Sequence, residues 1–141
     1  MAKKVAVVTG GMGGLGESIT TKMADAGYQV VVTYSPSNTK YKSWLDEMKG
    51  KGYGFSAYPV DVVSYEDSAA KCAQIQKECG NIDILVNNAG ITRDTTFKKM
   101  DKLNWDAVLR TNLDSLFNMT KQVADGMVDR DAALHRSARL A

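Results

Sequence analysis

The order of apolar patterns along the chain constrains its fold more than any other feature. Short runs rich in β-branched residues alternate with longer segments in which apolar residues recur at helical spacing. The predicted strands are residues 4–8, 29–34, 55–60 and 82–86, and the predicted helices are residues 15–26, 41–49, 64–79 and 103–128. This alternation implies parallel strands joined by right-handed helical crossovers, and therefore an α/β fold with a doubly wound parallel sheet. Ligands of such sheets bind at the carboxyl ends of the strands.

Turn and cap residues support these boundaries. Gly27, Gly50 and Gly80 follow the first three predicted helices, and glycine is typical of helix ends. Ser64 precedes the third helix, with acidic residues in the first turn, which is the usual pattern of a helix N-cap.

Length and composition narrow the class of protein. A chain of 141 residues has room for one domain with a hydrophobic core, and a net charge of +2 gives no reason to expect nucleic acid or a membrane surface as partner. The apolar run after Lys4 is too short for a secretory signal, and no stretch approaches the roughly 20 apolar residues that span a bilayer. We therefore expect a cytoplasmic protein.

Five glycines occupy the seven positions from Gly10 to Gly16, directly after the first predicted strand. Their spacing fits both G-x-G-x-x-G and the longer G-x-x-x-G-x-G. A P-loop is excluded because Glu17 stands where that loop needs lysine. In both remaining spacings the loop ends at a helix N-terminus, where free N–H groups favour a pyrophosphate. The cluster predicts a dinucleotide site, although a tight strand-to-helix turn alone would also use glycine.

The end of the second predicted strand bears on which dinucleotide is bound. A site for NAD usually places an acid there, but no acid occurs between Asp25 and Asp46. Hydroxyl side chains, including Ser35, are followed by Lys40, and together they suit the 2′-phosphate of NADP. The alternative is a solvated turn with an incidental lysine.

Two further patterns on predicted helices have structural explanations. Cys72 and Cys79 share a helical face with apolar residues, so packing as reduced thiols explains them better than a metal or redox site, for which His135 is the only other soft ligand. Asn112 falls on an apolar stripe of the last helix; the stripe comprises Trp105, Leu109, Leu116, Met119, Val123 and Met127. A buried amide needs hydrogen-bond partners, so a satisfied core asparagine is one interpretation and a functional amide is the other.

The segment ILVNNAGITRD at residues 84–94, together with TGGMGGLG at residues 9–16, resembles the short-chain dehydrogenase/reductase family. The resemblance implies a Rossmann-type sheet, the G-x-x-x-G-x-G register with Gly10, Gly14 and Gly16, and a turn in which Gly11 and Gly13 allow close approach to NADP. It implies that Asp61 accepts from the adenine amino group and that Asn112 holds a water of a proton relay. The cofactor-binding residues expected on this basis, with those from the strand ends, are Gly10, Met12, Gly13, Gly14, Leu15, Gly16, Ser35, Lys40, Val60, Asp61, Val62, Asn88, Ala89, Gly90, Ile91 and Thr92.

Within the family, residues 90–100 are similar to reductases of 3-oxoacyl thioesters. Met12-Gly13 and residues 120–127 favour the branch that reduces acetoacetyl-CoA to (R)-3-hydroxybutanoyl-CoA for polyhydroxybutyrate synthesis. Asp94 matches a residue near the acyl substrate. Arg93, Lys98 and Lys99 could attract coenzyme A phosphates, although a solvated basic face explains them equally well. The alternatives are a carrier-protein thioester reductase, another dehydrogenase of the family, and a non-catalytic NADP-binding fragment.

The resemblance covers residues 1 to about 130 and leaves residues 131–141 as an atypical tail. In the family, a strand ending in a catalytic serine follows the long helix, and a tyrosine and a lysine four residues later come next. The tail has no β-branched residue, and Ser137 has no strand before it, so we do not assign it as that serine. We expect a truncated or frameshifted form of a longer homotetrameric reductase, inactive alone, with an uncovered edge strand and apolar helix faces that favour aggregation.

Overall fold

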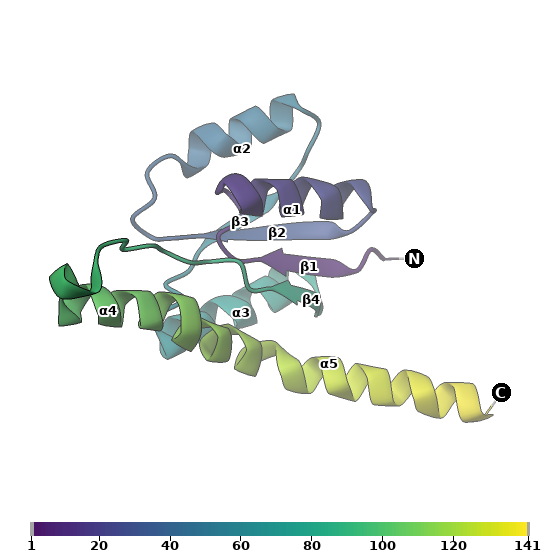
Figure 1. Cartoon of the computed structure of the whole chain (residues 1–141). Coiled ribbons are helices and arrows are strands. Elements are labelled where there is room, and N and C mark those ends of the chain that lie inside the picture. Colours follow the sequence, from purple (N-terminus) through teal and green to yellow (C-terminus); the bar gives the residue numbers. More distant parts are fainter. Residues whose placement is uncertain (1, 141) are drawn as a thin grey trace.

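The computed structural model describes the backbone of residues 2–140 and the side chains of residues 2–133. It contains a parallel four-stranded sheet in the order β3-β2-β1-β4, with helices on both faces (Figure 1). The elements are β1 (Val5–Val8), α1 (Gly14–Asp25), β2 (Gln29–Tyr34), α2 (Tyr41–Gly50), β3 (Ser56–Pro59), α3 (Tyr65–Cys79), β4 (Ile82–Val86), a 3₁₀ turn (Phe97–Lys99), α4 (Lys102–Leu109), a π turn (Arg110–Asp114) and α5 (Ser115–Leu140). The predicted doubly wound, Rossmann-type sheet is confirmed.

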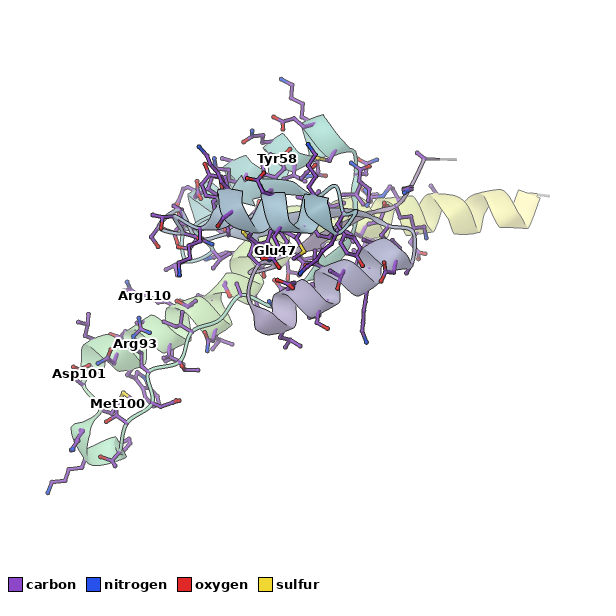
Figure 2. The ribbon with its side chains drawn as sticks, turned by 90° about the horizontal axis from the view of Figure 1, so that it is seen from above. Glu47, Tyr58, Arg93, Met100, Asp101 and Arg110 are labelled. Carbon is purple, nitrogen blue, oxygen red and sulfur yellow. The ribbon has the colours of Figure 1, made fainter. Side chains whose placement is uncertain are left out.

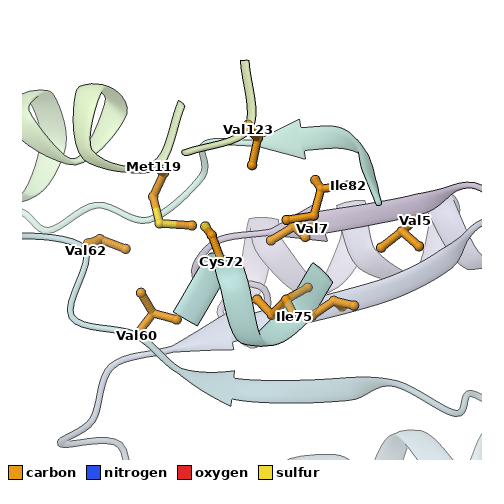
Figure 3. Close-up of a cluster of buried hydrophobic side chains, with 10 residues drawn as sticks. Val5, Val7, Val60, Val62, Cys72, Ile75, Ile82, Met119 and Val123 are labelled. Atoms are coloured by element: carbon orange, nitrogen blue, oxygen red, sulfur yellow. The ribbon is translucent and has the colours of Figure 1, made fainter. Parts of the chain in front are cut away.

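The two faces of the sheet carry separate hydrophobic clusters. On one face, Val8, Val30 and Val32 pack against side chains of α1 and α2. On the other face, strand residues pack against α3 and α5 (Figure 3); this cluster comprises Val5, Val7, Val31, Val60, Val62, Cys72, Ile75, Ile82, Met119 and Val123. Both faces of β1 and β2 are therefore buried, as a parallel sheet requires.

Most predicted boundaries lie within one or two residues of the observed ones, and the predicted caps form. Ser64 Oγ accepts a hydrogen bond from the backbone N–H of Asp67 at 3.1 Å, and Gly80 ends α3 with a φ of +103°. Leu15 is different. The first predicted helix begins with it, but it is 71% exposed, because Gly16 and Thr20 occupy the core side of that turn.

The prediction of one regular helix from residue 103 to 128 is wrong in two respects. The helical segment continues to Leu140, and a π turn interrupts it at Arg110–Asp114. A π turn holds more residues than an α turn and rotates the following face. Met119 and Val123 are buried as predicted, but Trp105, Leu109 and Leu116 are 47%, 40% and 38% exposed.

Strand β4 lies at one edge of the sheet, and the middle of α5 contacts its start through Arg130. Arg130 Nη2 donates to the carbonyl oxygen of Ile82 at 2.5 Å and lies 3.6 Å from the Asp83 carboxylate. Asp83 in turn accepts from the backbone N–H of Val5 at 2.9 Å. These contacts attach α5 to β4 and β1. Over the described part of the chain, no helix has the length and apolarity needed to cross a bilayer.

Candidate functional site

The glycine turn lies at the carboxyl end of β1, and its own packing requires two of its glycines. Gly10 has a φ of +62°, and a Cβ there would lie 3.0 Å from the Cα of Ala89. At Gly16 a Cβ would lie 2.2 Å from the carbonyl oxygen of Gly10 and 2.8 Å from Asn88 Nδ2. The turn therefore folds back tightly on itself and on the segment after β4.

Gly11 is required for a different reason. A Cβ there would lie 2.7 Å from Val32 Cγ1 of β2 and 3.0 Å from Thr20 Oγ1 of α1. Gly11 thus allows α1 to approach the sheet, which differs from the expectation that it allows the turn to approach a cofactor. The sequence could not distinguish these two roles of Gly11, because each of them requires a residue without a side chain.

Gly13 and Gly14 face open space. A Cβ at Gly14 would meet nothing within 4 Å, and one at Gly13 would meet only the Gly10 carbonyl oxygen at 3.7 Å. Gly13 is the N-cap of α1 and has no side chain that could accept from the N–H groups of the first turn. A pyrophosphate fits this position, because it would meet backbone donors and the positive end of the helix dipole without a side chain in its way.

A hydrogen-bond network attaches the turn to the segment after β4. Asn88 Nδ2 donates to the carbonyl oxygens of Thr9 and Gly10, both at 3.1 Å. Thr9 Oγ1 accepts from the backbone N–H groups of Asn88 and Ala89, both at 3.0 Å. Asn88 therefore acts here as a structural residue that fixes the conformation of the glycine turn.

A hollow of about 250 Å³ extends from this turn across the carboxyl ends of the strands. It brings together eight residues predicted for the cofactor: Gly10, Ser35, Val60, Asp61, Val62, Ala89, Gly90 and Ile91. Its lining also includes four residues that were not predicted from the sequence: Thr33, Tyr34, Val63 and Thr111. Thr33 and Tyr34 could have been found, because they end a strand beside Ser35, whereas Thr111 lies in the unpredicted π turn.

Two of the predicted side chains have local partners. Ser35 Oγ lies 2.9 Å from Ser37 Oγ. Asp61 Oδ1 accepts from the backbone N–H of Val63 at 3.2 Å. Lys40 is exposed at the start of α2, outside the hollow's lining, so its ammonium is accessible from the same edge of the sheet.

The Asn112 amide binds the backbone of Ile91 in both directions. Its Oδ1 accepts from the Ile91 N–H at 2.8 Å, and its Nδ2 donates to the Ile91 carbonyl oxygen at 2.9 Å. Asn112 is exposed, so the prediction of a buried amide on an apolar stripe is wrong; the π turn alters the helical phase at this position. The amide holds residues 90–91 beside the strand ends.

A second hollow, of about 360 Å³, is lined in part by the two residues of this contact. It is lined by the predicted residues Ile91, Thr92, Asp94 and Asn112, together with Arg93, Met100, Trp105, Val108 and Leu109. Arg93 and Met100 lie on the segment that, with α4, extends away from the sheet (Figure 2). Asp94 and Asn112 therefore share one hollow, whereas Met12, Gly13, Gly14 and Leu15 line neither of the two.

The cysteines lie away from both hollows. Cys72 is buried in the α3–α5 cluster, and burial raises the pKa of its thiol to about 11. Cys79 Sγ lies 3.4 Å from the hydroxyl of Tyr58, and both cysteines are free. The side chain of His135 lies outside the described residues, as does that of Ser137.

The chain is similar to proteins of one enzyme family. A model of the short chain dehydrogenase family matches residues 4–134. An acetoacetyl-CoA reductase from Cupriavidus necator is 45% identical over 130 residues, which are 92% of this chain and 53% of that protein. A 3-oxoacyl-acyl-carrier-protein reductase from Staphylococcus aureus is 37% identical over 125 residues, covering 89% of this chain and 51% of that protein.

A solved structure shares the fold. The crystal structure of a gluconate 5-dehydrogenase from Burkholderia cenocepacia in complex with NADP and tartrate superposes with a TM-score of 0.80 at 29% identity, covering 92% of this chain and 51% of that one. The chain thus spans about half the length of the relatives it matches.

Proposed function

Because this chain belongs to the short chain dehydrogenase family, whose model matches residues 4–134, we propose that its glycine turn binds the pyrophosphate of NADPH. The observation that carries the proposal is the open space at Gly14, next to an α1 N-terminus that no side chain caps. The hollow that follows the turn would receive the adenosine half of the cofactor, with Asp61 near the adenine.

NADP is preferred over NAD in this proposal because of the end of β2. Ser35 and Lys40 are exposed there, and the first acid after Asp25 is Asp46, inside α2. Hydroxyl donors and an ammonium favour a phosphate dianion, whereas the carboxylate usual in NAD sites would repel it. The gluconate 5-dehydrogenase that shares this fold was crystallised with NADP, which supports the same preference.

The substrate we propose is the thioester acetoacetyl-CoA, reduced to (R)-3-hydroxybutanoyl-CoA by the complete protein, as in polyhydroxybutyrate synthesis. Support comes from the acetoacetyl-CoA reductases among the relatives and from the hollow that holds Asp94 and Arg93 beside Asn112. A carrier-protein thioester is the second candidate, because a relative of that name is 37% identical.

When bound, NADPH would supply the hydride for the 3-keto carbon. The chain's own residues would bind and orient: the glycine turn would hold the phosphates, and Asn112 would fix residues 90–91 at the strand ends. A role of Asn112 in a proton relay is part of the same proposal and follows from the family resemblance. The sequence has no tyrosine followed four residues later by lysine, the pair expected to protonate the alkoxide. We therefore propose that these 141 residues bind the dinucleotide without turnover. A separate proposal, which follows from the family resemblance, is that the complete protein is a cytoplasmic homotetramer.

Isothermal titration of the chain with NADPH and NADH tests the cofactor. We expect NADPH to bind more tightly, and Gly14→Val to abolish binding while thermal stability stays nearly unchanged, because the added side chain enters open space. Gly50→Val is the matched control, since a Cβ at Gly50 also meets nothing within 4 Å but lies at the far end of α2. Binding that survives Gly14→Val would contradict the proposed phosphate site.

A further inference from the structure

Glu17 carries a negative charge in the helix turn that directly follows the proposed phosphate site. It lies in the first turn of α1, directly after Gly16, and its N–H donates to the carbonyl oxygen of Gly13 at 2.6 Å. In the free chain an acid in this turn is favourable, because it faces the positive end of the helix dipole. A bound pyrophosphate would compete for the same positive end and would be repelled by a carboxylate that turned toward it.

The structure holds this carboxylate against the side chain of Trp44 on α2. Glu17 Oε2 accepts a hydrogen bond from Trp44 Nε1 at 2.7 Å. Lys51 Nζ lies 4.0 Å from the other oxygen, but it lies only 2.6 Å from Glu47, so its charge is shared. The indole N–H is therefore the shortest contact of the Glu17 carboxylate.

Trp44 is itself fixed in direction. Its ring stacks on Phe55, with centroids 5.7 Å apart and planes at 18°, and it packs against the Val8, Val30 and Val32 cluster of the sheet. A ring held on two sides presents its N–H along one direction. This makes the indole a rigid donor rather than an adaptable surface contact.

We propose that Trp44 is a positioning residue for the cofactor: its indole N–H keeps the Glu17 carboxylate off the pyrophosphate site. The inference rests on the proposed function, since it needs a phosphate-bearing ligand at the glycine turn. It adds that α2 contributes to phosphate binding without touching the phosphates. Two contacts then join α2 and its preceding loop to the turn, because Asn38 Nδ2 also lies 3.9 Å from Met12 Sδ.

The test is a set of variants titrated with NADPH and with 2′-AMP, which lacks a pyrophosphate. Trp44→Phe keeps the aromatic ring and removes the N–H, and we expect it to weaken NADPH binding about tenfold, the scale of a hydrogen bond to a charged group. Glu17→Asp keeps the charge but is one methylene too short for the 2.7 Å contact, so it should weaken NADPH similarly. Affinity for 2′-AMP should stay within twofold of wild type in both variants.

Glu17→Gln is the matched control, because it removes the charge and keeps the length. We expect NADPH binding at or above the wild-type level. Adding Trp44→Phe to Glu17→Gln should weaken NADPH binding by less than twofold. A merely structural role for Trp44 would instead weaken NADPH and 2′-AMP together, with or without the Glu17 charge, and would overturn the inference. The same holds if Glu17→Asp binds NADPH as wild type does.

The proposed function and the role of Trp44 fail in different ways. A wild-type chain that binds neither NADPH nor NADH overturns the proposed function and, with it, this inference. A wild-type chain that binds NADPH while the Trp44 and Glu17 variants bind it equally well overturns the inference alone. The Glu17 variants change a partly exposed side chain, so the test does not depend on Trp44→Phe folding.

Discussion

At the scale of single residues, the glycines of the turn divide by what surrounds them. Gly10, Gly11 and Gly16 face the chain's own atoms, whereas Gly14 faces open space. A sequence pattern gives all of them equal weight, because it records only that a side chain is absent. The structure separates those needed for folding from those available for a ligand.

This division predicts that the same substitution has a large effect at one glycine and a small effect at the other. Gly16→Ala would put a Cβ 2.2 Å from a backbone oxygen, which cannot move as a flexible side chain would. We expect it to lower the free energy of unfolding by roughly 2–4 kcal/mol, while Gly14→Ala changes it by less than about 0.5 kcal/mol. Urea unfolding followed by circular dichroism measures both. Equal midpoints for the two variants would refute this division of the glycines.

The Cys72 thiol predicts how stability depends on alkaline pH. Burial raises its pKa in the folded chain from the ordinary 9.0 to about 11, so between these values the unfolded chain releases this proton while the folded chain keeps it. The contribution of the neutral Cys72 thiol to the free energy of unfolding is therefore present in full below pH 9 and is lost as the pH rises through 11. The free energy of unfolding, measured across this pH range, should fall more steeply in wild type than in Cys72→Ala. Parallel curves would count against a buried neutral thiol.

At the scale of elements, helix capping is predictable from sequence and can be tested. Ser64 Oγ satisfies the N–H of Asp67 in the first turn of α3. We expect Ser64→Ala to destabilise the chain by about 1 kcal/mol and Ser64→Asp, which retains an acceptor, to have little effect. The measurement is the denaturation midpoint of each variant. A neutral Ser64→Ala would show that α3 is held by packing alone.

The elements predicted correctly have strong local signals, and the missed ones do not. The run of β-branched residues in β2 and the cap of α3 specify their own conformations. The π turn at Arg110–Asp114 has no such signal, because its sequence is compatible with a regular α-helix. The same holds for the candidate site. Its residues at the strand ends were predicted, whereas Thr111 lies in the π turn and Asn112 binds Ile91 across 21 residues of sequence, and neither has a local signal.

At the scale of the whole molecule, the balance between buried and exposed apolar surface differs along the chain. The valines of β1 and β2 are buried in the sheet, whereas large apolar side chains on the α4–α5 segment remain exposed. Leu113 and Phe117 are 58% and 63% exposed and lie one helical turn apart, and β4 is an edge strand of the sheet. Contiguous apolar surface of this kind is a site of association.

We therefore expect the 141-residue chain to self-associate, with a sedimentation coefficient that rises with concentration in the micromolar range. Replacing Leu113 and Phe117 together by glutamine should reduce the association, because it removes apolar area without adding charge. Lys121→Gln is the control, since it changes an exposed residue one turn further along the same face of α5. Association that persists in the double variant but falls when β4 is disrupted by Ile84→Pro would locate it at the sheet edge. A single monomeric species for wild type at every concentration would contradict the prediction, and would mean that the α4–α5 side chains tolerate exposure to water in the isolated chain.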